Sequence, residues 1–145
     1  MVALAIAGFF MGVAVPGGWK MYESMQYRKA VRDVTAVAAA ARYGAITSGV
    51  SRDVVLEPGT GRYRLGRSGE ESGSQRFRQL PDSVSMSAET AAEVSPGPQL
   101  AAIRFYPDGS SSGGSISITR SELSPPTGVR LRVDWLLGRV TQEPL

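Results

Sequence analysis

The sequence predicts an α+β fold in which one long N-terminal helix packs on a small antiparallel β-sheet domain. Up to residue 48 apolar side chains recur at the helical period, and after residue 49 polar and apolar residues alternate as in half-buried strands. Glycine and proline clusters separate the alternating segments, as expected of turns between antiparallel strands. These changes of pattern divide the chain into an apolar part of the helix (1–18), an amphipathic part (19–48) and a globular antiparallel β-domain (49–145).

The chain opens with an uncharged apolar run from Met1 to Val15. As a helix this run would measure roughly 22 Å, whereas the hydrocarbon core of a bilayer is about 30 Å thick. Three interpretations follow: a secretory signal peptide, a buried core helix, or a transmembrane helix that lacks its first turn or two. No basic residue precedes the run and Pro16–Trp19 is a poor cleavage site, so the sequence favours a transmembrane segment over 1–18 that starts before Met1.

Residues 19–47 predict a helix that continues the apolar run. One face carries apolar residues at alternating steps of four and three: Tyr27, Val31, Val34, Ala38, Ala41 and Ala45. Charged residues lie off this stripe: Arg28, Lys29, Arg32, Asp33 and Arg42. The alanines are strong helix formers with thin side chains, so another layer can approach closely. Ser48–Gly49 is the expected helix end, because glycine accepts the left-handed conformation.

The segments after residue 49 predict short half-buried antiparallel strands. They are 54–56, 62–67, 76–80, 84–87, 103–105, 115–119 and 129–134. The last is the clearest, since Val129, Leu131 and Val133 alternate with charged side chains. Trp135 follows it, and we expect this large side chain to pack on the sheet or the helix. Residues 88–99 lack clear periodicity and are predicted to form a mobile loop.

The composition excludes several kinds of enzyme. The chain has no Cys and no His, which removes thiol chemistry, the commonest general base and the commonest metal ligand. The Gly/Ser run from Asp108 to Gly114 is unlike a P-loop, because Ser115 stands in place of the lysine and a strand follows. Asp82, Asp108 and Asp134 lack the local spacing of a calcium loop. We therefore expect no catalytic residue, no cofactor and no metal.

Arginine is by far the more frequent basic residue in this chain. The net charge is only +3, but 14 of the 16 basic residues are arginine, since only Lys20 and Lys29 are lysine. An arginine excess invites a nucleic-acid interpretation, because the guanidinium group binds phosphate bidentately. Outward-facing arginines on strands explain the same excess, and the sequence favours that interpretation. Under a DNA-binding alternative, a phosphate-binding stripe would consist of Arg62, Arg64, Arg67, Arg76 and Arg78.

Three segments resemble a known family. Residues 103–118 (IRFYPDGSSSGGSISI) are similar to the F-x-P-x-G-x-x-x-G-G-x-[IV] block of the GspH/FimT family. Residues 129–140 (VRLRVDWLLGRV) resemble that family's closing hairpin with its Leu-x-Gly-Arg turn, and residues 1–8 resemble the continuation of the prepilin signature. The motif positions, which carry turns rather than chemistry, are Phe105, Pro107, Gly109, Gly113, Gly114, Asp134, Gly138 and Arg139.

The resemblance implies a pilin-like fold and the function of an H-type minor pseudopilin of a type II secretion system. Such a subunit would be a single-pass protein of the bacterial inner membrane, with residues 19–145 in the periplasm. Its helix would contact membrane lipid and other major and minor pseudopilins in a pseudopilus that helps move folded proteins across the outer membrane, with secreted substrate as a further partner. The predicted membrane anchor comprises Ala3, Ala5, Ala7, Gly8, Phe9, Phe10, Gly12 and Val13, whose small members let helices approach closely in lipid.

The resemblance also implies residues before Met1. The mature chains of this family begin with a Phe at the cleavage site and carry an early Glu, which this sequence lacks. About six added residues would lengthen the apolar helix to roughly 31 Å, enough to span a bilayer. Lys20 and Arg28 after the run argue for the opposite orientation when taken alone, and a basic leader before Met1 would resolve that conflict.

Two other functions fit the same sequence. A type IV pilus minor pilin of the FimT kind would take part in pilus assembly or DNA uptake and would use the arginine stripe. A membrane-anchored adhesin or scaffold would form no filament.

Overall fold

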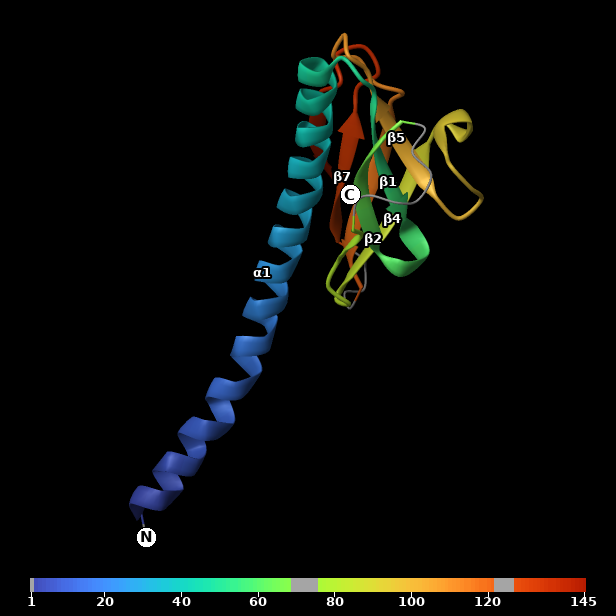
Figure 1. Ribbon diagram of the computed structural model, residues 1–145. Coiled ribbons are helices and arrows are strands. Elements are labelled where there is room, and N and C mark those ends of the chain that lie inside the picture. The colour runs from blue at the N-terminus through green and yellow to red at the C-terminus, as the bar shows by residue number, and fades with distance from the viewer. Residues whose placement is uncertain (1, 69–75, 122–126) are drawn as a thin grey trace.

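One long helix, α1 (Val2–Ser48), leads into a β-domain (Figure 1). The computed structural model describes the backbone of residues 2–68, 76–121 and 127–145, and the side chains of those residues from Met21 onward. The C-terminal half of α1 lies along the β-domain, and its N-terminal part extends beyond it (Figure 1). The predicted helix end is confirmed: Gly49 has a φ of 67° and donates its N–H to the carbonyl of Ala45.

The α+β prediction is confirmed, and the described strands of the antiparallel β-domain form two four-stranded sheets. The sheet orders are β3-β2-β1-β5 and β4-β6-β7-β8. The strands are β1 (Arg52–Glu57), β2 (Arg62–Arg67), β3 (Arg78–Gln79), β4 (Val84–Thr90), β5 (Ala101–Phe105), β6 (Gly114–Arg120), β7 (Gly128–Val133) and β8 (Val140–Pro144). Two short 3-10 helices, η1 (Pro58–Thr60) and η2 (Ala92–Val94), lie in the connections.

Most predicted strands are confirmed, with two differences. The segment 76–80 pairs only over Arg78 and Gln79. The predicted loop over 88–99 is wrong at its start, because Ala88 pairs with Ile116 and Thr90 with Gly114, so that β4 continues to Thr90. Ala88 and Thr90 are only weakly apolar, so the sequence does not show the polar/apolar alternation of a half-buried strand here, although both residues pair with β6.

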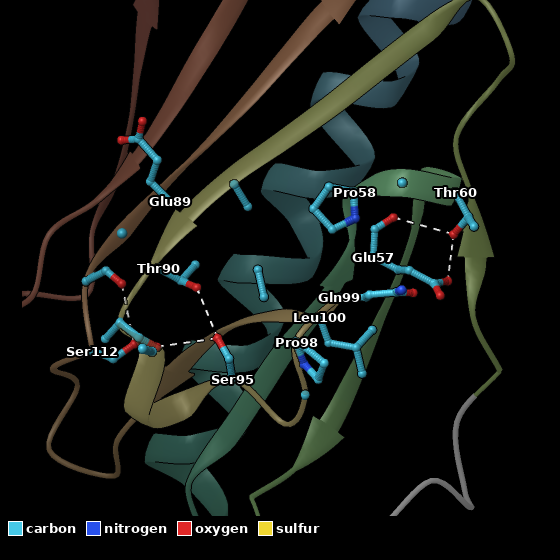
Figure 2. A pocket seen from close by; sticks show the side chains of 18 residues that line it. Glu57, Pro58, Thr60, Glu89, Thr90, Ser95, Pro98, Gln99, Leu100 and Ser112 are labelled. Atoms are coloured by element: carbon cyan, nitrogen blue, oxygen red, sulfur yellow. Dashed lines mark hydrogen bonds between the residues drawn. The ribbon is translucent and has the colours of Figure 1, made fainter.

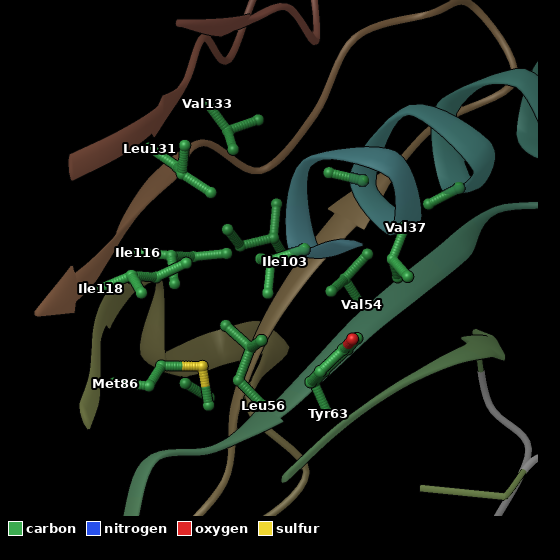
Figure 3. Packing of buried hydrophobic residues seen from close by; sticks show 14 of the residues in the cluster. Val37, Val54, Leu56, Tyr63, Met86, Ile103, Ile116, Ile118, Leu131 and Val133 are labelled. Carbon is green, nitrogen blue, oxygen red and sulfur yellow. The ribbon is translucent and has the colours of Figure 1, made fainter. Parts of the chain in front are cut away.

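The core lies between α1 and the inner faces of both sheets (Figure 3). The predicted apolar stripe of α1 is buried, except for Tyr27, which packs against its edge. Ala30 and Val37 are buried as well, so the helix covers the sheets with a wider face than the stripe alone. Both sheets and the helix supply the largest fully buried side chains: Phe105, Leu56, Ile103, Ile116, Ile118, Leu131, Val34 and Val54. The helix is therefore a layer shared by the two sheets.

An ion pair crosses the outer face of the first sheet. Arg104 on β5 donates two hydrogen bonds of 2.8 Å to the carboxylate of Asp53, its cross-strand partner on β1. These hydrogen bonds raise the pKa of Arg104, and the bidentate geometry is the strong form of this interaction. The pair fixes the register of β5 against β1, and β5 leads directly into the first motif loop.

The buried stripe gives a direct test. Ala41 is completely buried, whereas Ala39, two positions earlier on the same helix, is exposed. We expect Ala41→Leu to lower the free energy of unfolding by about 1–3 kcal/mol, because extra methylene groups must be forced into a packed core. Ala39→Leu should change it by less than about 0.5 kcal/mol. Urea unfolding of the full chain in detergent micelles, followed by circular dichroism, measures both; equal losses would contradict this packing.

Candidate functional site

Both motif segments lie at one end of the molecule, beside the last turns of α1. The β5–β6 loop (106–113) and the β7–β8 turn (134–139) meet there, at the top of Figure 1. Ser111 joins them: its N–H donates to the carbonyl of Trp135 at 2.8 Å, and its hydroxyl donates to the carbonyl of Asp134 at 2.9 Å. We call this end, formed by residues 42–50, 106–113 and 134–139, the apex.

Arg42 connects both motif segments to the helix. Its Nε–H points at two carbonyl oxygens, that of Gly109 at 3.2 Å and that of Leu137 at 3.0 Å. A charged donor shared between two acceptors stabilises both at once. In the sequence, Arg42 is one of the charged residues off the apolar stripe, and nothing there indicates this role. No local pattern could have found it, because the two acceptors lie 67 and 95 residues away in the chain.

The β7–β8 turn is built around Asp134. Its Oδ1 accepts hydrogen bonds from the N–H groups of Leu136 at 2.9 Å and Leu137 at 2.7 Å, as Asp side chains commonly do in turns. Gly138 donates its N–H to the carbonyl of Asp134 at 2.9 Å and closes the turn. These bonds direct Trp135, Leu136 and Leu137 outward, with 66, 59 and 54% of each exposed. The expectation that Trp135 packs on the sheet or the helix is therefore wrong.

Two motif glycines permit close approach between the segments. Gly138 has a φ of 59°, and a Cβ at this position would collide with the carbonyl oxygen of Gly109 and press on the Arg42 side chain. Gly113 has a φ of 72°, and a Cβ there would lie 3.2 Å from the Cβ of Trp135. Any other residue at either position would be strained by its backbone conformation as well as crowded.

The other motif residues support the β5–β6 loop or flank the turn. Phe105 is fully buried at the end of β5, and Pro107 is exposed in the loop that follows. Asp108 accepts hydrogen bonds from the hydroxyl and the N–H of Ser110, which lower the pKa of its carboxyl group. Gly114 begins β6 between Thr90 and Val133. Arg139 is exposed beside the turn.

A cavity that reaches from the β1–β2 turn to the edge of the apex offers little chemistry (Figure 2). It measures about 1110 Å³ and is lined by the β1–β2 turn, the end of β4, the segment around η2 and residues 112–114. Its Glu57 accepts hydrogen bonds from Thr60 at 2.6 Å and Arg62 at 2.7 Å, and these lower the pKa of the carboxyl group. A carboxylate held ionised in this way is a poor proton acceptor. Across the described residues, no group of three or more acidic side chains could hold a metal ion.

The five arginines of the predicted DNA-binding stripe do not share one face. Arg62 and Arg64 lie on the outer face of β2, over the ring of Phe77 at 5.3 and 5.2 Å. Arg78 is the cross-strand partner of Tyr63, which faces the core, so it lies on the opposite side of the sheet. The prediction of one continuous stripe is wrong, because the register of β2 and β3 divides its members between two faces.

The predicted membrane anchor, from Ala3 to Val13, lies outside the residues whose side chains are described, although its backbone belongs to α1. Among the helical residues that could be searched, no stretch is both long and apolar enough to cross a bilayer. Where side-chain description begins, α1 exposes three large apolar residues: Met21, Tyr22 and Met25. An apolar helix surface thus continues toward the predicted anchor.

Comparisons with known proteins agree on one family. The family model described as "Type II transport protein GspH" matches residues 30–137, which include all of the apex except residues 138 and 139. The "Type II secretion system protein H" of Xanthomonas campestris pv. campestris is 28% identical over 144 residues, covering 98% of this chain and 76% of that protein.

Solved structures show the same fold at low sequence identity. The type IV minor pilin FimU of Pseudomonas aeruginosa has a TM-score of 0.63 and 14% identity, covering 86% of this chain and 92% of that one. The minor pseudopilin EpsH of Vibrio cholerae has a TM-score of 0.60 and 14% identity, covering 81% and 94%.

Removing the Arg42 side chain should loosen the apex. We expect Arg42→Ala to lower the free energy of unfolding by about 1–2 kcal/mol, because two carbonyl groups lose a charged donor. Arg32→Ala provides the control, since Arg32 is an exposed arginine of the same helix that makes no hydrogen bond among the described residues; its effect should stay below about 0.5 kcal/mol. Denaturant titration distinguishes the variants, and similar values for both would rule out the bridging role.

A side chain at Gly138 should be more damaging. We expect Gly138→Ala to destabilise the chain by more than about 2 kcal/mol, since the left-handed backbone and the collision with Gly109 add together. Gly59→Ala is the matched control, because a Cβ at Gly59 meets no atom within 4 Å and its φ is not positive. Thermal unfolding compares the two; a tolerated Gly138→Ala would show that the two motif segments can separate.

Proposed function

This chain belongs to the GspH family of type II transport proteins and is a minor pseudopilin of a type II secretion system, and we propose from this that α1 anchors it in the bacterial inner membrane and joins it to other pseudopilins. The observation that carries the proposal is the match over residues 30–137, the segment that forms the second half of α1 and most of the β-domain. The β-domain would then lie in the periplasm.

The geometry of α1 supports this role. With 47 residues, α1 measures roughly 70 Å, far more than the β-domain needs for its packing. The part that extends beyond the domain carries the uncharged run and then the exposed Met21, Tyr22 and Met25. Such a surface is stable only against lipid or other apolar helices. Alternating small residues in the run would let neighbouring helices approach closely in both settings.

We assign the chain a structural role without catalytic activity. Its sequence lacks His and Cys, and the Glu57 carboxylate in the cavity beside the β1–β2 turn is held by Thr60 and Arg62. The work of moving secreted proteins would therefore come from other components of the system, and this subunit would transmit it through the packing of its helix.

A pilus function is the second candidate. The similarity to the minor pilin FimU, at 14% identity, concerns the fold alone. DNA binding through the five arginines has less support than the sequence suggested, since Arg62 and Arg64 lie on a different face from Arg78. A filament subunit that contacts other subunits is common to both candidates.

Anchoring can be tested with one substitution made at two positions. We expect Val13→Asp to shift the protein out of the membrane fraction and to reduce secretion, because a charge inside a membrane helix is costly, by about 2.5–3.5 kcal/mol at the helix centre. Val50→Asp, just beyond the end of α1, is the matched control and should leave fractionation unchanged. Both variants are made at the gene's own locus in the bacterium that encodes it.

The measurements are carbonate extraction of membranes and the amount of a type II substrate in the medium. Membrane association that survives Val13→Asp, with secretion intact, would show that the run does not anchor the chain.

A further inference from the structure

The apex exposes a cluster of large apolar side chains. Two come from the last turns of α1, Tyr43 at 71% and Ile46 at 44% exposure, and three from the β7–β8 turn: Trp135, Leu136 and Leu137. We call these five residues the apical patch. Scattered single apolar residues are normal on a protein surface, but a contiguous group of this kind marks an interaction site.

The patch has a defined shape. A hollow of about 380 Å³ lies between α1 and the β7–β8 turn, with Tyr43, Ile46, Leu137 and Arg139 in its lining. Trp135 and Leu136 project from the same turn beside it. The surface thus offers both a projecting group and a recess, which is how well-packed interfaces interlock.

The patch is also held rigidly before any partner arrives. Asp134 fixes the N–H groups of Leu136 and Leu137, and Arg42 holds the carbonyl of Leu137 on the helix. Side chains and loops that are already ordered lose little freedom on binding, so more of the contact energy remains for affinity. Tryptophan, tyrosine and arginine, the residue types that dominate binding energy at interfaces, are all present here.

Charged groups of both signs border the patch. Arg139 is exposed beside the turn, and Arg132 is exposed near the end of β7 that leads into it. Asp134 and Asp108 lie at the same end, where Asp134 accepts hydrogen bonds from its own turn and Asp108 accepts them from Ser110. A partner surface would therefore match this one with an apolar centre and a rim that carries charges of both signs.

We propose that the apical patch docks the globular domain of another pseudopilin subunit through such a surface; this rests on the function proposed above. A lipid surface does not fit, because the patch lies at the C-terminal end of α1, roughly 70 Å from the end that would enter the membrane. A secreted protein fits less well as the partner, because it must dissociate from the patch in order to be secreted. Apolar side chains that are held exposed to water favour a partner that covers them permanently. Permanent protein–protein interfaces are also more apolar than transient ones.

Crosslinking from single cysteines tests the proposal in the intact system. The chain has no Cys, so each introduced thiol is unique. Leu136→Cys places it on the patch, Ser87→Cys on the exposed face of β4 as the control, and Tyr22→Cys on the helix beyond the β-domain. Cells that secrete a type II substrate are treated with a thiol-reactive photocrosslinker, and products are identified by mass spectrometry.

We expect Leu136→Cys to give a product with another pseudopilin and Ser87→Cys to give little. A crosslink from Tyr22→Cys without one from Leu136→Cys would overturn the apical interface and leave the proposed function intact. No pseudopilin product from either position would overturn both. A Leu136→Cys product formed only with secreted substrate would also overturn the proposal.

A second variant tests the apolar contact itself. Adding Leu137→Asp to Leu136→Cys should lower the yield of the apical product about tenfold or more, the loss expected for a central interface residue. The Tyr22→Cys product should be unaffected by Leu137→Asp, which shows that the variant still folds and inserts. An unchanged apical product would contradict the proposal.

Discussion

The close approach of α1 to both sheets is the constraint from which the rest of this structure follows. Ala38, Ala41 and Ala45 are buried where larger side chains would hold the helix away. Each sheet has one apolar face, and a four-stranded sheet without a second layer would leave that face in water. Because one helix covers both, the two sheets share a single core with the helix.

The apex depends on the same approach. Arg42 follows directly after Ala41, so the depth at which the helix packs sets how far its guanidinium group can reach across to the motif segments. Gly113 and Gly138 allow this close contact because they have no side chain. At the apex, the packing of the helix thus holds a surface in place, and the large apolar side chains of that surface remain exposed.

Periodicity in the sequence was enough to predict the helix, its end at Gly49, the buried stripe and most of the strands, because each depends on neighbouring residues. Features that depend on residues distant in the chain were not visible. The division into two sheets is decided by which strand edges meet, and Arg42 has its acceptors 67 and 95 residues away. Trp135 was expected inside because of its size, whereas the hydrogen bonds of Asp134 decide where it points. The separation of Arg62 from Arg78 likewise depends on the register of β3 against β2, which cannot be deduced from the amino-acid composition.

The edges of the two sheets carry a further consequence. β3 is only two residues long, β8 ends at Pro144, which has no N–H to offer, and the outer edge of β5 is occupied where Ser112 exchanges hydrogen bonds with Arg104. Short, proline-ended or occupied edges discourage strand-to-strand addition between copies. A subunit of the pseudopilin kind that presented long open strand edges would be at risk of associating by the wrong route. At the edges formed by β3, β5 and β8 that amyloid-like route is obstructed, which leaves the helix and the apex as the surfaces for ordered contacts.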